Sequence, residues 1–179
     1  MHRIGLSHIL IWLTSACALL LSSCSNQIKA DSAHLSHSFV HGKTAYLGPD
    51  GIAHAPPKAP KSVHKMVAAA NSLVGKPYKY GGGHRSFYDS AYDCSGAVSY
   101  ILHKGGKLDG RPLVSKEFFD YGKKGYGDHV TIYVRKGHVF MEICGLRFDT
   151  GGTWNSTGPR WKPERRGLKG YYVRHPRGL

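Results

Sequence analysis

Cys94 and His138 have the types and settings of a thiol nucleophile and its base. Cys94 stands in the run Tyr92-Asp93-Cys94-Ser95-Gly96-Ala97, at the first turn of an expected helix. Helix N-terminal amides stabilise a thiolate, so we expect a lowered pKa at Cys94. The small residues after it should leave room for a substrate backbone. His138 begins a β-rich run and lies far enough downstream to return on a facing strand. Such a pair predicts nucleophilic catalysis by cysteine.

Asp149 is the candidate for a third residue that orients His138. If the hairpin near residues 144–146 has a two-residue loop, residue 149 pairs with residue 140 or 142, and Asp149 shares a sheet face with His138. There it would accept a hydrogen bond from the imidazole and fix its tautomer. A three-residue loop would reverse this parity, and the alternative role for Asp149 is to cap a turn before Gly151.

The elements that position these residues follow an α+β order. Apolar residues recur at helical spacing over residues 62–74, with Ser62 as the expected N-cap. A second helix should start at Cys94, with Asp93 as its N-cap, and end at Gly105. Helices followed by antiparallel strands predict an α+β fold. The strands are expected over residues 128–134, 138–143 and 146–150, with 171–174 as a possible edge strand.

The composition limits the class of protein. The chain has 179 residues, of which 41% are hydrophobic and 20% charged, so we expect one domain with an appendage and not a disordered chain. Lys and Arg number 25 against 11 Asp and Glu, a formal net charge of +14. A balance this basic indicates an anionic partner, which is nucleic acid, a membrane surface or an anionic polymer.

The N-terminus selects among these partners. Arg3 precedes an apolar run from Ile9 to Leu21, which is too short to span a bilayer comfortably and has the form of a secretory signal. The run ends in Leu21-Ser22-Ser23-Cys24, which resembles the lipobox of bacterial lipoproteins, where the cysteine becomes the lipidated first residue. The alternative is an ordinary signal peptide with an incidental cysteine. An exported chain rarely meets genomic DNA, so we expect wall polymer or lipid as the anionic partner and no nucleic acid.

We therefore expect three segments: a signal peptide over residues 1–23, a lipidated Cys24 with a flexible tether over 24–61, and a catalytic domain over 62–179. The tether contains four histidines without paired metal-ligand spacing, which favours a solvated linker over a metal site.

In an exported protein a disulfide between Cys94 and Cys144 is the default. The setting of Cys94 and the position of Cys144 further along the strand favour two free cysteines instead.

Four pieces of sequence together resemble the NlpC family of bacterial cell-wall cysteine peptidases. They are Gly75-Lys76-Pro77-Tyr78-Lys79-Tyr80-Gly81-Gly82, Asp93-Cys94-Ser95-Gly96, Gly127-Asp128-His129-Val130 and Gly137-His138-Val139. Each piece alone is weak, the combination is specific, and the similarity covers residues 62–179. The resemblance implies a papain-like fold, with helices packed on a small antiparallel sheet, and hydrolysis of peptidoglycan stem peptides, typically at the D-glutamyl to diamino-acid bond.

The resemblance also implies roles for single residues. Cys94 matches the nucleophile and His138 the base, while Tyr78 matches the tyrosine that helps to stabilise the oxyanion beside the Cys94 amide. Asp93 and Ser95 match positions that hold the amino end of the substrate. No metal or other cofactor is implied. We expect a monomer held by its lipid in the cell envelope, on the periplasmic face of the outer membrane if the host is diderm.

Other functions stay open from the sequence. Asp149 stands where the family commonly has His, Asn or Gln, which leaves substrate specificity undecided. A peptidoglycan-binding lipoprotein without catalysis would keep the same fold, and acyl transfer would use the same thiol. Residues 150–179 carry seven Lys and Arg among aromatic residues. This pattern fits a surface that faces substrate and equally a solvated loop whose aromatic residues close the core.

Overall fold

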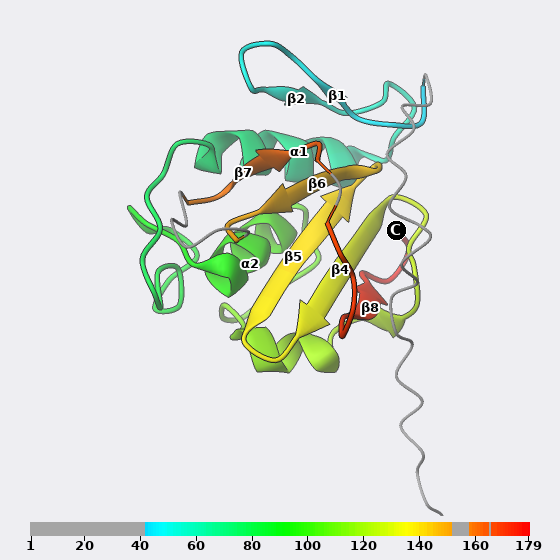
Figure 1. Ribbon diagram of the computed structural model, residues 1–179. Coiled ribbons are helices and arrows are strands. Elements are labelled where there is room, and N and C mark those ends of the chain that lie inside the picture. The colour runs from blue at the N-terminus through cyan, green and yellow to red at the C-terminus, as the bar shows by residue number, and fades with distance from the viewer. Residues whose placement is uncertain (1–41, 152–157, 165) are drawn as a thin grey trace, which may run out of the picture.

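The computed structural model describes residues 42–151, 158–164 and 166–179 (Figure 1). Within these ranges the chain forms α-helices and two antiparallel sheets, which confirms the predicted α+β class. The expected signal peptide and Cys24 lie outside the described residues. In chain order the elements are β1 (Tyr46–Leu47), β2 (Ala53–His54), α1 (Lys61–Leu73), α2 (Cys94–Lys104), the 3-10 helix η2 (Ser115–Phe119), β3 (Lys123–Lys124), β4 (Val130–Arg135), β5 (His138–Ile143), β6 (Leu146–Asp149), β7 (Arg160–Lys162) and β8 (Tyr172–His175).

Both helices form where the apolar spacing predicts them. α2 begins at Cys94, and its N-cap Asp93 accepts a hydrogen bond from the Gly96 amide, as expected for a short acidic side chain at this position. The expectation that Ser62 caps α1 is wrong. Pro60 is the N-cap, its carbonyl accepts the Val63 amide at 2.9 Å, and Ser62 therefore lies inside the first helical turn.

The main sheet has the strand order β3-β8-β4-β5-β6-β7 within the described residues. Strands β4, β5 and β6 form consecutive hairpins, close to the ranges expected from sequence. β8, expected as an edge strand, lies between β3 and β4 instead, because the short strand β3 pairs with its outer side. The sequence pattern misses β3 because a strand of two residues has no readable alternation.

The turn between β5 and β6 sets which side chains share a face. Ile143 pairs with Leu146, so the loop contains two residues, Cys144 and Gly145, with φ of +48° and +74°. Positive φ at both loop residues is the geometry of a type I′ turn. In this register Asp149 follows the pair Met141–Phe148, so it lies on the same face as His138, as the hairpin parity predicted.

The sheet separates two apolar clusters. The larger one joins α1 and α2 to the face of the sheet that carries Val139 and Met141. Figure 1 shows both helices on this one side of β4, β5 and β6. The opposite face carries Tyr133 and Phe140, which pack with the segment between β7 and β8. Because α2 contacts β5, the N-terminus of the helix and the start of the strand can meet at one edge of the core.

Strands β1 and β2 lie within residues 24–61, which we interpreted as a tether. They pair as a hairpin that contacts α1, and Figure 1 shows it along that helix. Ala45 and Ala53 are buried in the larger cluster. Asn71 of α1 accepts from the Ala53 amide and donates to its carbonyl, and it also accepts from the indole of Trp161 in β7. One side chain therefore links hairpin, helix and sheet.

No helix among the described residues has the length and apolarity to cross a membrane.

Candidate active site

Cys94 lies at the first residue of α2, beside the start of β5. The backbone N–H of Val139, the residue after His138, donates to its sulfur and lowers its pKa. Burial has a larger effect: Cys94 is 9% exposed, and burial together with the nearby charge of Asp93 raises the pKa of the thiol to about 11. The expectation of a lowered pKa is therefore wrong for the resting protein, where the thiol is neutral.

The small residues beside Cys94 do not provide space for substrate. A Cβ on Gly96 would lie 2.1 Å from the carbonyl oxygen of Gly82, and one on Gly83 would lie 2.9 Å from the Gly96 Cα. The backbone of the glycine-rich turn before α2 fills this space. The clearance that we attributed to a substrate backbone thus allows two parts of the same chain to pack closely.

His138 and Asp149 form a hydrogen-bonded pair, in which Asp149 is buried and His138 is half-buried. Nε2 of His138 lies 2.9 Å from Oδ1 of Asp149, and the two side chains are 13% and 0% exposed. An ionised carboxylate only accepts hydrogen bonds, so Nε2 carries the proton and Nδ1 is the other ring nitrogen, free in this tautomer to accept one. Gly151 packs against the imidazole, since a Cβ there would lie 2.7 Å from its Cε1 atom. The ring is therefore held by a hydrogen bond on its edge and by backbone on its face.

Two arginines that the sequence does not identify also contact Asp149. Arg166 Nη1 lies 2.7 Å and Arg147 Nη1 lies 3.2 Å from Oδ2 of the carboxylate. Burial raises the pKa of Asp149, but the hydrogen bond from His138, the charge of Arg166 and the Gly151 amide outweigh it, so the pKa is lowered and the group is ionised. The sequence could have identified Arg147, because strand alternation places it on the same face as Asp149. It could not have identified Arg166, which is one of seven basic residues in the C-terminal segment whose spacing follows no pattern.

Tyr78 lies near the Cys94 thiol. It forms an isolated bridge with Tyr92, two residues before Cys94, and its side chain is partly exposed. Partial burial, with the nearby Cys94 and Asp93, raises the pKa of the Tyr78 phenol, so it remains a hydrogen-bond donor at neutral pH.

Asp93 and Ser95 are both buried and already hydrogen-bonded within the chain. The Asp93 carboxylate accepts from the amides of Gly81 and Gly96 and from the Ser95 hydroxyl. His84, which the sequence does not single out among twelve histidines, places Nε2 3.1 Å from Asp93 Oδ1 and 3.0 Å from Ser95 Oγ. His84 therefore already contacts polar side-chain atoms of both residues.

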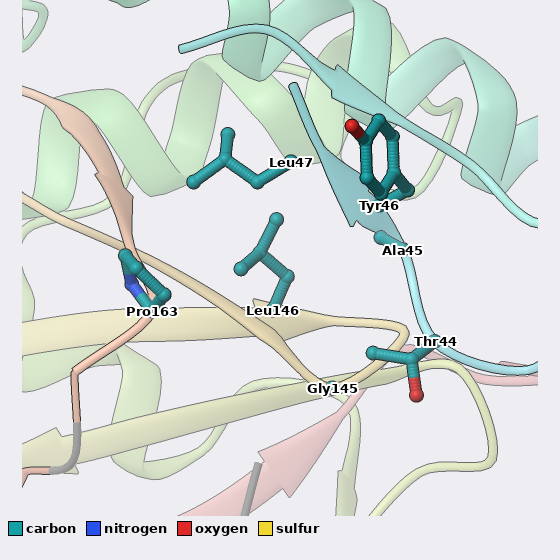
Figure 2. Close-up of a pocket in the computed structure, with 7 residues that line it drawn as sticks. All are labelled: Thr44, Ala45, Tyr46, Leu47, Gly145, Leu146 and Pro163. Atoms are coloured by element: carbon teal, nitrogen blue, oxygen red, sulfur yellow. The ribbon is translucent and has the colours of Figure 1, made fainter. Parts of the chain in front are cut away.

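The other described features lie away from this site. A pocket of about 380 Å³ lies between β1 and the β5–β6 turn, where Figure 2 shows Leu47, Leu146 and Pro163 beside one another. Its lining contains none of the predicted site residues.

Cys94 and Cys144 are both free, as expected. Among the described residues no group of His, Cys, Asp and Glu has an arrangement that could hold a metal ion.

The chain is similar to one characterised type of protein over a short region. No protein-family model matches it. It is 46% identical over 43 residues to the probable peptidoglycan endopeptidase LytE of Bacillus subtilis (strain 168). This region is 24% of the chain and 12% of LytE, so the chain spans only a small part of that protein. Over about a quarter of its length, then, the chain is similar to a peptidoglycan endopeptidase.

Proposed function

We propose that the chain is a cysteine peptidase that hydrolyses amide bonds in peptidoglycan stem peptides. The observation that carries this proposal is the meeting of Cys94, at the start of a buried helix, with the start of β5, where His138 is hydrogen-bonded to Asp149. The partial similarity to LytE supports the substrate class. Cys94 would be the nucleophile, His138 the base and Asp149 the residue that orients the base.

The protonation states favour general-base catalysis from a neutral thiol. Nδ1 of His138 takes the thiol proton as the Cys94 sulfur attacks the carbonyl carbon. The C–N bond then breaks, and the amine leaves with that proton. Water next attacks the thioester, giving one proton to His138 and releasing the acid, after which the sulfur regains its proton from His138. The Cys94 amide and the Tyr78 hydroxyl are the proposed donors to the oxyanion.

The cellular setting is part of the proposal. Residues 1–23 would direct export, and Cys24 would carry the lipid that holds the enzyme at the envelope, close to its polymeric substrate. Because several acyl chains add about 0.8 kcal/mol for each buried methylene, such an anchor would be stable. Asp93 and Ser95 would contribute to substrate binding only where His84 moves away, since their acceptor atoms are already used.

Mass spectrometry of muropeptides tests the proposal. Purified sacculi are incubated with the wild-type chain, Cys94→Ala and the matched control Cys144→Ala, and the released fragments are identified. We expect fragments cut within the stem peptide from the wild type and the Cys144 variant. Cys94→Ala should lower their release by about a thousandfold or more, because the variant lacks the thiol that would form the thioester. Equal release by the Cys94 variant would refute the assignment.

One observation favours a second function, a peptidoglycan-binding protein without catalysis. The buried Cys94 thiol, with a pKa of about 11, is little ionised at neutral pH. Such a protein would bind sacculi without releasing fragments, and thiol-directed electrophiles would not modify its Cys94. The same incubation, with bound protein measured by sedimentation, separates the two functions.

A further inference from the structure

The two carboxylate oxygens of Asp149 have different partners. Oδ1 accepts from His138 Nε2 at 2.9 Å and from the Gly151 amide at 2.9 Å. Oδ2 accepts from Arg166 at 2.7 Å and from Arg147 at 3.2 Å. One oxygen therefore faces the candidate base, and the other faces two cations.

Arg166 is held rigidly beside Asp149. Its Nη2 donates to the Tyr171 hydroxyl at 2.7 Å, and Nη1 also approaches the Gly151 carbonyl at 3.3 Å. The guanidinium lies over the rings of Phe140 and Tyr171, 5.1 and 5.5 Å from their centres. The side chain is only 14% exposed, so this positive charge is fixed and weakly screened by solvent.

We propose that Arg166 is a positioning residue for His138, whose charge offsets that of Asp149, so that the carboxylate orients the imidazole without holding it as an imidazolium. A carboxylate beside an imidazole favours its second proton, yet only a neutral imidazole can accept the proton of a neutral thiol. Arg166 thus weakens the preference for an imidazolium that the Asp149 carboxylate alone would create. This inference rests on the proposed function, because it assigns His138 the role of base.

Other charged groups face this pair from every neighbouring element. Arg147 interacts with other acidic residues besides Asp149: its Nη2 lies 3.7 Å from Glu164, and it lies opposite Glu142 in the sheet. Arg166 forms its ion pair with Asp149. Arg166 is therefore the more specific counter-charge. The remaining groups are Arg135 of β4, Glu142 of β5, Arg160 and Lys162 of β7, Tyr171 before β8, and Cys94 with Asp93 at the start of α2.

The protonation of the His138 ring tests this role without a substrate. The full chain is labelled with 15N histidine, and the ring nitrogen shifts of His138 are followed by NMR over about pH 5 to 9. In Arg166→Gln and Arg166→Met the loss of the second proton should move to higher pH than in the wild type by about one unit, because the charge of Asp149 is no longer offset.

Two further variants separate charge from structure. Arg166→Lys keeps a cation within reach of Asp149 and should stay close to the wild-type profile. Lys169→Gln removes an exposed positive charge three residues away and should not shift it. Methionine retains apolar contact with Phe140 and Tyr171, so it tests the charge should the glutamine variant unfold.

The outcomes are distinct. A titration of His138 at the wild-type pH in either folded, uncharged Arg166 variant overturns the inference, and so does unfolding of both, since Arg166 would then act through the fold. If the shift is found but the wild type releases no muropeptides, only the proposed function fails. If muropeptides are released and the shift is absent, only the role of Arg166 fails.

Discussion

Burial and hydrogen-bonded partners together set the protonation of Cys94 and Asp149. It raises the pKa of the Cys94 thiol to about 11, while His138, Arg166 and the Gly151 amide keep the pKa of Asp149 low despite its burial. The thiol is therefore neutral and the carboxylate ionised at neutral pH. As the proposed nucleophile, this thiol would form a thiolate only as its proton is removed, so the proposed catalysis would depend on the alignment of the imidazole.

Gly151→Ala tests this alignment. Its Cβ would lie 2.7 Å from Cε1 and 3.0 Å from Nε2 of His138, so the ring must shift. We expect kcat to fall by about ten- to a hundredfold, because small misplacements of a catalytic group carry costs of this size. Muropeptide release and thermal melting are measured together. Gly167→Ala, where the added Cβ meets nothing within 4 Å, is the control and should keep full activity. A fully active Gly151 variant would show that the ring is not held this way.

Glu142→Gln tests a second effect of burial, on stability. Burial raises the pKa of Glu142 from 4.5 to about 7, although the Tyr133 hydroxyl and Arg147 oppose the shift. The folded state therefore binds a proton more tightly than the unfolded state. The contribution of Glu142 to the free energy of unfolding is therefore fully present below about pH 4.5 and declines as the pH rises to about 7. Above that pH it is constant, after a total loss of up to about 3 kcal/mol.

The measurement is the difference in free energy of unfolding between wild type and Glu142→Gln as a function of pH. The wild type should lose stability relative to the variant as the pH rises from about 4.5 to 7. Glu117→Gln provides a control of opposite sign, because the Arg111 ion pair lowers the pKa of Glu117 to about 2. Its contribution is present above about pH 4.5 and is lost on acidification. A difference for Glu142→Gln that does not change with pH contradicts the account.

At the scale of elements, the sequence predicts the features that have local causes. The N-cap of α2 follows from Asp93 before a helical apolar pattern, and the His138–Asp149 pairing follows from strand alternation across a two-residue loop. The contacts of Arg166 depend on where the segment after β7 folds back, which no local pattern encodes. Strands β1, β2 and β3 have two residues each and are too short for alternation to be read.

The β1–β2 hairpin should contribute to stability although it precedes the expected domain. A chain that starts at Ser62 loses both hydrogen bonds between Asn71 and Ala53, as well as the buried Ala45 and Ala53. We expect it to be at least about 2 kcal/mol less stable to urea than a chain that starts at Gly42. The control is Asn71→Ala in both chains. This substitution should cost less in the shorter chain, where Trp161 is the remaining partner, and equal costs would mean that the hairpin and α1 are uncoupled.

At the scale of the whole molecule, part of the +14 charge is used internally. Arg147, Arg166 and Arg174 direct their guanidinium groups to partners within the fold. Trp161 and Tyr171 of the basic C-terminal segment are buried. For these two residues the structure confirms that the aromatic side chains close the core. Trp154 lies outside the described residues. The cations available to an anionic polymer are therefore those that remain exposed, among them Arg135 at the end of β4 and Lys136 in the turn before His138.

The exposed cations near the site should make catalysis depend on salt. Raising NaCl from about 50 to 300 mM should increase KM for sacculi and leave kcat little changed, since salt screens exposed charges and not the buried pair. Lys136→Gln should increase KM at low salt, and Lys65→Gln, at an exposed position of α1, serves as its charge-matched control. Turnover assays across the salt series measure both constants. A KM independent of salt would place the source of wall affinity elsewhere.

The β5–β6 turn also limits which genetic changes the protein can survive. Replacing Cys144 by asparagine or glycine keeps a loop of two residues, and both types adopt positive φ readily. Inserting or deleting a single codon instead turns every later side chain of β6 to the opposite face. Asp149 and Arg147 would then point toward the helices, and the imidazole of His138 would lose its partner. Over evolutionary time the turn can thus exchange residues that adopt positive φ, while its length is fixed for as long as the pair is kept.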